Sequence, residues 1–245
     1  MFESVAQLAA RAHTHGSTLV RLAQKLGYSG FPELRSALQA ELISSRRTDD
    51  LIRARLKDSK STDLLPRLLE REIAALTDVT NFISQADIDA AADRILAADR
   101  ITVIAEGTAE ALARHATHRL RRAGKVMLQL QPDPRSLAEG ATLLRTGDVA
   151  IGFALRLIPP LLAGYFDHVR AQGGVTILVS DLSGLSLRPS PDHLLAASRG
   201  NDMESGTLTV PMALLNALIL TCAERGQPDT LSALKTYTDI RDDLT

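Results

Sequence analysis

The chain has 245 residues, 45% of them hydrophobic, so it can bury one sizeable core and still form a smaller second unit. Its single cysteine, Cys222, excludes an intrachain disulfide and fits a reducing compartment. No run of about 18 uncharged apolar residues is present, and the first residues lack the basic-then-apolar pattern of a secretion signal. We therefore expect a cytoplasmic protein with no membrane partner.

Charge is divided unevenly along the chain, although the formal net charge is only -1. Residues 1–60 carry ten Lys and Arg against six Asp and Glu, whereas the rest carry eighteen against twenty-three. The formal net charge is thus about +4 for residues 1–60 and about -5 for the rest of the chain. A mildly basic front on an acidic body fits a nucleic-acid-binding head on a ligand-binding body.

The first 45 residues predict a small all-α unit. Apolar residues recur at helical spacing over residues 4–12 and again over 17–26, where Gly27 provides a stop, and a third helix is expected to end near residue 43. Two short helices joined by a turn of about three or four residues are the geometry of a helix-turn-helix. The second helix of that motif enters the DNA major groove.

The second of these helices presents a polar face that could read DNA. Hydroxyl and basic side chains suit base edges and phosphates, while a merely solvated face is the alternative interpretation. The candidate DNA-binding residues are Ser17, Thr18, Arg21, Lys25 and Tyr28.

Residues 46–62 are charged and poor in apolar side chains, which predicts a linker. Two amphipathic helices are expected after it, over residues 64–83 and 87–98. A long apolar helix over 208–223 and an amphipathic tail complete the chain. The apolar side chains of residues 208–219 exceed what one small sheet needs, so we expect them to form a homodimer interface.

Between these helices the pattern predicts a parallel α/β sheet. Short apolar runs rich in β-branched residues alternate with helical patterns, which is typical of a parallel sheet covered on both faces. Ligands of such sheets bind beyond the carboxyl ends of the strands. The expected strands are 101–105, 126–130, 149–153, 175–179 and 193–197, with helices over 109–123, 135–144 and 159–172.

Several segments resemble one known family, the RpiR-type transcriptional regulators. Residues 4–9, 17–22 and 25–34, with a Lys-Leu-Gly-Tyr-Ser-Gly-Phe run, are similar to the RpiR-type helix-turn-helix. Residues 101–124, ending in Leu-Arg-Arg-x-Gly, resemble the opening of a sugar isomerase (SIS) domain, and the likeness continues through Gly-Asp-Val at 147–149 and Ser-Asp at 180–181.

The resemblance implies an α/β fold, a parallel five-stranded three-layer SIS sandwich preceded by a small all-α helix-turn-helix domain. It divides the chain into residues 1–45, a linker over 46–62 and the SIS domain over 63–245. It implies a DNA-binding regulator of carbohydrate metabolism genes. Its partners would be double-stranded operator DNA, a phosphorylated sugar and a second copy in a homodimer, with a tetramer as the alternative. Family members carry one or two further helices before the segment that begins at Ser4, so the head is expected to be truncated.

The sugar-phosphate loops depart from the family pattern. The usual Gly-x-Gly-Ser-Ser after the first strand is replaced by Ala-Glu-Gly-Thr-Ala at 105–109, and the usual Ser-x-Ser-Gly after the third by Ala-Leu-Arg-Leu at 154–157. An arginine can bind phosphate bidentately, which hydroxyls cannot. The candidate ligand-binding residues are Gly107, Thr108, Arg156 and Ser180.

Two other functions remain open on sequence alone. A SIS-domain isomerase would need a base such as Glu106, Glu110 or Glu204, although an enzyme has no need of a helix-turn-helix. A ligand-binding protein that has lost DNA recognition is the other alternative. No cofactor motif is present, and no metal site is expected, because the histidine pair at 115 and 118 lacks a third ligand and is surrounded by arginines.

Overall fold

The computed structural model describes residues 15–26, 28, 30, 31, 34, 63–200 and 207–244. The predicted helix over residues 4–12, nearly all of the third helix and the linker over 46–62 lie outside the described residues. The second helix is α2, Gly16–Lys25. Its Ala23 is buried with Phe31 and Leu34, and three partly buried side chains pack against this small cluster: Leu19, Val20 and Tyr28.

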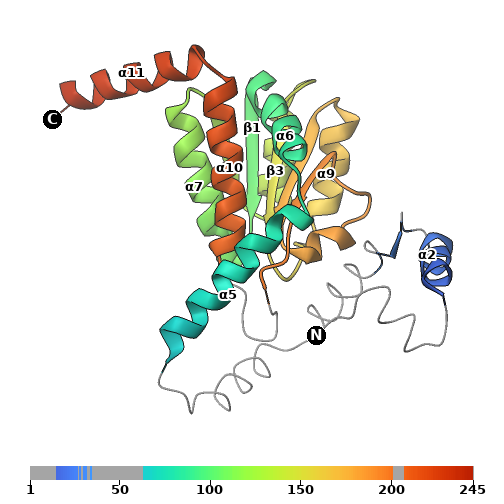
Figure 1. The fold of residues 1–245 in the computed structure, drawn as a ribbon. Helices are drawn as coiled ribbons and strands as arrows, with labels where there is room; N and C mark the ends of the chain where they lie inside the picture. The colour runs from blue at the N-terminus through green and yellow to red at the C-terminus, as the bar shows by residue number, and fades with distance from the viewer. Residues whose placement is uncertain are drawn as a thin grey trace.

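The remainder of the chain is built around a parallel five-stranded sheet with the order β2-β1-β3-β4-β5 (Figure 1). Each predicted strand is confirmed to within one or two residues, because β-branched apolar runs bounded by turns form strands that are buried on both faces. The strands are β1 Arg100–Ala105, β2 Val126–Leu130, β3 Val149–Ala154, β4 Val175–Ser180 and β5 His193–Ala196.

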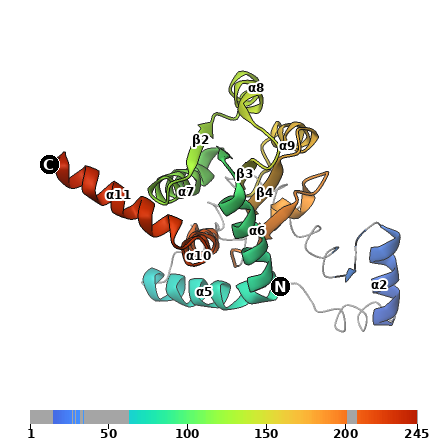
Figure 2. The same cartoon turned by 90° about the horizontal axis from the view of Figure 1, so that it is seen from above.

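Helices cover both faces of this sheet, which gives three layers (Figure 2). On one face lie α5 Leu64–Asp78, α6 Gln85–Ala97, α7 Glu110–Arg122 and α10 Thr209–Arg225, whose buried side chains form the larger core cluster. On the other lie α8 Pro134–Leu143 and α9 Leu162–Ala171, with a second cluster. A final helix, α11 Asp229–Asp243, follows α10.

A buried carboxylate ties the amino ends of the two central strands together. Asp148, only 2% exposed, accepts hydrogen bonds from the backbone N–H of Arg100 at 2.9 Å and of Arg145 at 2.8 Å. These bonds connect the start of β1 to the turn that precedes β3 and supply donors to the buried carboxylate.

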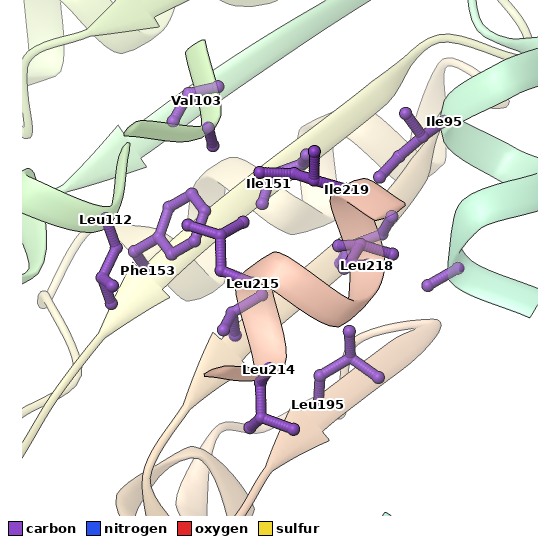
Figure 3. Packing of buried hydrophobic residues seen from close by; sticks show 14 of the residues in the cluster. Ile95, Val103, Leu112, Ile151, Phe153, Leu195, Leu214, Leu215, Leu218 and Ile219 are labelled. Atoms are coloured by element: carbon purple, nitrogen blue, oxygen red, sulfur yellow. The ribbon is translucent and has the colours of Figure 1, made fainter. Parts of the chain in front are cut away.

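The apolar residues of α10 do not form a surface, which corrects the predicted basis of a dimer interface. Leu214, Leu215, Leu218 and Ile219 are buried inside one chain, and Figure 3 shows them pointing at Ile151, Phe153 and Leu195 of the sheet and at helix residues Ile95 and Leu112. The sequence could not reveal this, because a helix that covers the centre of a sheet needs as much apolar surface as one that pairs with another subunit.

Cys222 belongs to the same core. Burial raises the pKa of its thiol to about 12, so the thiolate needed for reaction or metal binding is scarce near neutral pH. This agrees with a buried structural thiol.

Two neighbouring leucines of α10 test the packing. Leu218 is 1% exposed and Leu220 is 55% exposed. Leu218→Ala should lower the free energy of unfolding by roughly 2–5 kcal/mol, because it opens a cavity between α10 and the sheet. Leu220→Ala, measured in the same urea titration, should change it by less than about 0.5 kcal/mol. Equal effects would contradict the assigned orientation of α10.

Candidate ligand and DNA sites

The strand order defines one crevice at the carboxyl edge of the sheet. The chain leaves β1 toward α7 on one face and β3 toward α9 on the other, and β1 and β3 are neighbours. This is a topological switch point, where the loops after two adjacent strands separate and leave room for a ligand. The flanking loops are 106–109 and 155–161.

The loop after β1 presents backbone to this crevice. Gly107 has φ +61, a left-handed conformation that favours glycine, and no other group lies within 4 Å of where its Cβ would be. Thr108 is exposed and lies in a 3₁₀ turn, Gly107–Ala109, that leads into α7 and has no side-chain cap at Glu106. Uncapped N–H groups and the positive end of the helix dipole favour an anion here.

Arg156, in the loop after β3, is held in a strained backbone conformation. Its φ of +67 makes it the one non-glycine with a left-handed backbone in the described part of the chain. Such a conformation costs on the order of 1–3 kcal/mol and persists only where the surroundings impose it. Here the backbone N–H of Arg156 donates to Asp181 Oδ2 at 2.9 Å.

Asp181, directly after β4, joins three loops at this edge of the sheet. Its Oδ1 accepts from the backbone N–H and hydroxyl of Ser183 at 3.0 and 2.6 Å. Its Oδ2 accepts from Arg156, and it forms an ion pair with Arg199, whose Nη2 lies 2.6 Å away. The carboxylate thus connects the loops that follow β3, β4 and β5.

The sequence analysis did not predict the ion pair between Asp181 and Arg199. Both side chains are buried, at 6% and 5% exposed, and Arg199 lies only three residues after β5. The one signal in the sequence was Asp181 at the end of a strand within the Ser-Asp segment that resembles a SIS domain. Nothing local marked Arg199 as its partner, since 18 residues separate the two.

Ser180, predicted to bind ligand, lies at the expected edge but faces inward. Its side chain is fully buried, and its hydroxyl donates to the carbonyl of Ala154 at 2.6 Å. In this arrangement the hydroxyl links the ends of β3 and β4. Gly107, Thr108 and Arg156 therefore remain as the candidates whose groups lie on the two loops of the crevice.

The candidate DNA-binding residues lie on or just after α2. Ser17, Thr18, Arg21 and Lys25 are all exposed, as a reading face requires. Tyr28 is only partly exposed and packs against the Ala23 cluster. Leu22 and Leu26, which the helical period placed on the buried side, are 48% and 58% exposed.

Other kinds of site are not found in the described ranges. No group of three His, Cys, Asp or Glu side chains there could hold a metal ion. None of the helices found there is long and apolar enough to cross a membrane. Glu106 and Glu110, the candidate isomerase bases, are exposed, and Glu204 lies outside the described residues.

Comparison with solved structures identifies the fold as that of a sugar isomerase domain. The sugar isomerase domain of an RpiR transcription factor from Sphaerobacter thermophilus matches 73% of this chain and 99% of its own, with a TM-score of 0.65 and 24% identity. The NanR protein of Vibrio vulnificus, solved with ManNAc-6P, matches 100% of this chain and 87% of its own, with a TM-score of 0.62 and 19% identity.

A phosphoheptose isomerase from Francisella tularensis has the same fold, with a TM-score of 0.53 and 14% identity over 66% of this chain and 96% of its own. Residues 2–45 match the family model described as the helix-turn-helix domain of the rpiR family. Residues 2–45 are therefore similar to the rpiR-family helix-turn-helix, and the body that follows them has a sugar isomerase fold.

Removing the carboxylate of Asp181 tests whether it holds the three loops together. Asp181→Ala should lower the free energy of unfolding by about 3–5 kcal/mol, because a buried guanidinium loses its counter-charge and the Arg156 loop loses its anchor. Asp167→Ala is the matched control, since Asp167 pairs with Arg170 at 2.7 Å but is 55% exposed, and it should cost less than about 1 kcal/mol. Similar losses in chemical denaturation would show that Asp181 has no special role.

Proposed function

We propose that this protein is a DNA-binding transcriptional regulator of carbohydrate metabolism genes and that a phosphorylated sugar bound to its SIS domain controls it. The observation that carries the proposal is the presence, in one chain, of a match to the rpiR-family helix-turn-helix and a sugar isomerase fold with Arg156 in a loop at its switch point. The same proposal includes DNA binding by the helix-turn-helix and a cytoplasmic location. The NanR protein bound to ManNAc-6P supports the choice of a phosphorylated sugar.

The chemistry of the crevice suits an anion with hydroxyl groups. Arg156 would supply charge and two parallel donors for a phosphate, Thr108 a hydroxyl, and the uncapped 3₁₀ turn before α7 its backbone N–H groups. Glu106 would repel a phosphate at close range, but it is exposed, so its carboxylate can remain in water when an anion binds. Gly107 keeps the backbone open to the ligand.

Arg156 offers two substitutions that separate binding from stability. Arg156→Ala and Arg156→Gly should both lose roughly 1.5–3 kcal/mol of sugar-phosphate affinity, the scale of a charge-assisted hydrogen bond. Only Arg156→Gly also relieves the left-handed backbone, so its free energy of unfolding should be at least that of the wild type, whereas Arg156→Ala retains the strain.

Calorimetry against a panel of sugar phosphates measures the affinity, and urea denaturation measures the stability. A wild-type protein that binds none of the panel would refute the ligand class. An Arg156→Gly variant that binds as tightly as the wild type would remove Arg156 from the site.

We infer that the protein regulates and does not catalyse. Aldose-ketose isomerisation needs a base held against the carbon-bound proton of the substrate, and such bases work best where burial tunes their pKa. Glu106 and Glu110 are both exposed. Turnover of any bound sugar phosphate, followed by NMR, would overturn this inference.

The DNA contact is tested at Arg21. Arg21→Ala should weaken binding to the operator by about 1–3 kcal/mol if the guanidinium reads a base, and should lower the salt dependence if it contacts a phosphate. Anisotropy titrations on DNA selected from a random pool provide the measurement. Arg135→Ala is the control, because Arg135 is 89% exposed on α8. Unchanged affinity in Arg21→Ala would exclude it from the interface.

A further inference from the structure

A cavity of about 750 Å³ lies under helix α11, at the amino edge of the sheet. In both views α11 crosses the end of α7 there (Figures 1 and 2). The turn after α7, the turn after α10 and one side of α11 form its walls. Because α7 has 13 residues, the sugar crevice at its other end is about 20 Å away. A molecule bound in this cavity would therefore occupy a separate site.

The Leu-Arg-Arg-x-Gly segment at residues 120–124 holds α11 over the cavity. Gly124 has φ +86, and a Cβ on it would lie 3.0 Å from the Cβ of Ala233, so glycine allows this close approach. The Arg122 guanidinium lies 4.6 Å from the centre of the Tyr237 ring, which is a cation–π contact. This segment thus shapes a part of the molecule in which the sugar crevice has no share.

Basic side chains predominate in the lining of the cavity. Arg225 is neutralised there, because its Nη2 lies 2.7 Å from a carboxylate oxygen of Asp93. The other basic groups have no ion pair within the described residues. The charged side chains of the lining are four basic and one acidic: Arg121, Arg122, Lys125, Arg225 and Asp229.

The three remaining basic groups contact only neutral groups in the described part of the chain. Arg121 donates to the carbonyl of Met127 at 2.8 Å, and Lys125 donates to carbonyl groups at the end of α6. Arg122 lies against an aromatic ring, and its buried Nε has no hydrogen-bond partner. A carbonyl or a ring satisfies a donor but leaves the full positive charge in place.

Helix ends reduce this positive charge but do not cancel it. α6 and α7 both end at the cavity, and the carboxyl end of each helix carries about half a negative charge. Together with the exposed Asp229, these ends offset about two of the three positive charges. The surplus favours an anion. Phosphate is the anion that neighbouring arginines bind best, because each guanidinium offers it paired donors.

The rest of the lining suits a flat group attached to that phosphate. Tyr237 and Ile240, on the side of α11 that faces the cavity, are partly exposed, and Leu96 lies across from them. Apolar and aromatic walls with a few charged groups are typical of small-molecule sites, whose volumes are about 300–1,000 Å³. A phosphate ester with an aromatic ring system matches both parts of the lining, whereas inorganic phosphate matches only one.

We propose that this cavity is a second ligand site and that it binds a phosphate ester carrying a flat aromatic group, as a nucleoside monophosphate does. Arg121 and Arg122 bind the phosphate, Lys125 adds positive charge, and Tyr237 and Ile240 contact the aromatic group. The site is independent of the assigned sugar ligand and of DNA binding, because it lies at the other edge of the sheet.

Calorimetric titration of the full chain with AMP tests the site. Arg122→Gln should weaken AMP binding by about tenfold or more, because it removes a charge-assisted contact. Asp229→Asn should strengthen it by about two- to fivefold, because it removes an exposed like charge. Lys235→Gln is the matched control: Lys235 is exposed on the opposite side of α11 and does not line the cavity, so its loss should change the affinity by less than about twofold.

Two fragments of AMP test the two parts of the lining. Adenosine lacks the phosphate and inorganic phosphate lacks the aromatic group, so each should bind at least about tenfold more weakly than AMP. A wild type that does not bind AMP, or binds phosphate equally well, would overturn the proposal. So would an Arg122→Gln variant with wild-type affinity, or displacement of AMP by a sugar phosphate that binds the crevice. Circular dichroism verifies that every variant is folded.

Discussion

The buried carboxylate of Asp181 is the constraint on which the carboxyl edge of this protein depends. A charge this deep in the protein is unfavourable unless hydrogen bonds and an opposite charge compensate it. The compensation comes from Arg156, Ser183 and Arg199, in the loops after three successive strands. Each of the three loops contributes a hydrogen bond or an ion pair to the Asp181 carboxylate. The position of each loop therefore depends on the other two. Asp148 serves the amino edge in the same way, with one donor at the start of β1 and one in the turn before β3.

The strained backbone of Arg156 follows from that constraint. A left-handed arginine is unfavourable by itself, and the hydrogen bond from its N–H to Asp181 helps to impose it. The loop after β3 has no hydroxyl side chains, so the proposed phosphate contact in this loop falls to the guanidinium of Arg156. Under the proposed function, the energy that orders this loop is supplied by folding, before a ligand arrives.

Helix α7 runs from the loop after β1 to the helix α11. Its first turn borders the crevice at Thr108, and its last residues hold α11 through Arg122 and Gly124.

The sequence by itself determined the strands, the order of strands and helices, and the edge where the crevice lies. These depend on local patterns: the β-branched runs that became β1 and β3 are recognisable within a few residues. Tertiary structure decided which side chains face where. Ser180 faces inward to Ala154, the leucines of α10 are internal while those of α5 are exposed, and Asp181 meets Arg199. A pairing across 18 residues, or the choice of which apolar helix covers a sheet, is a property of packing, and no periodicity along the chain records it.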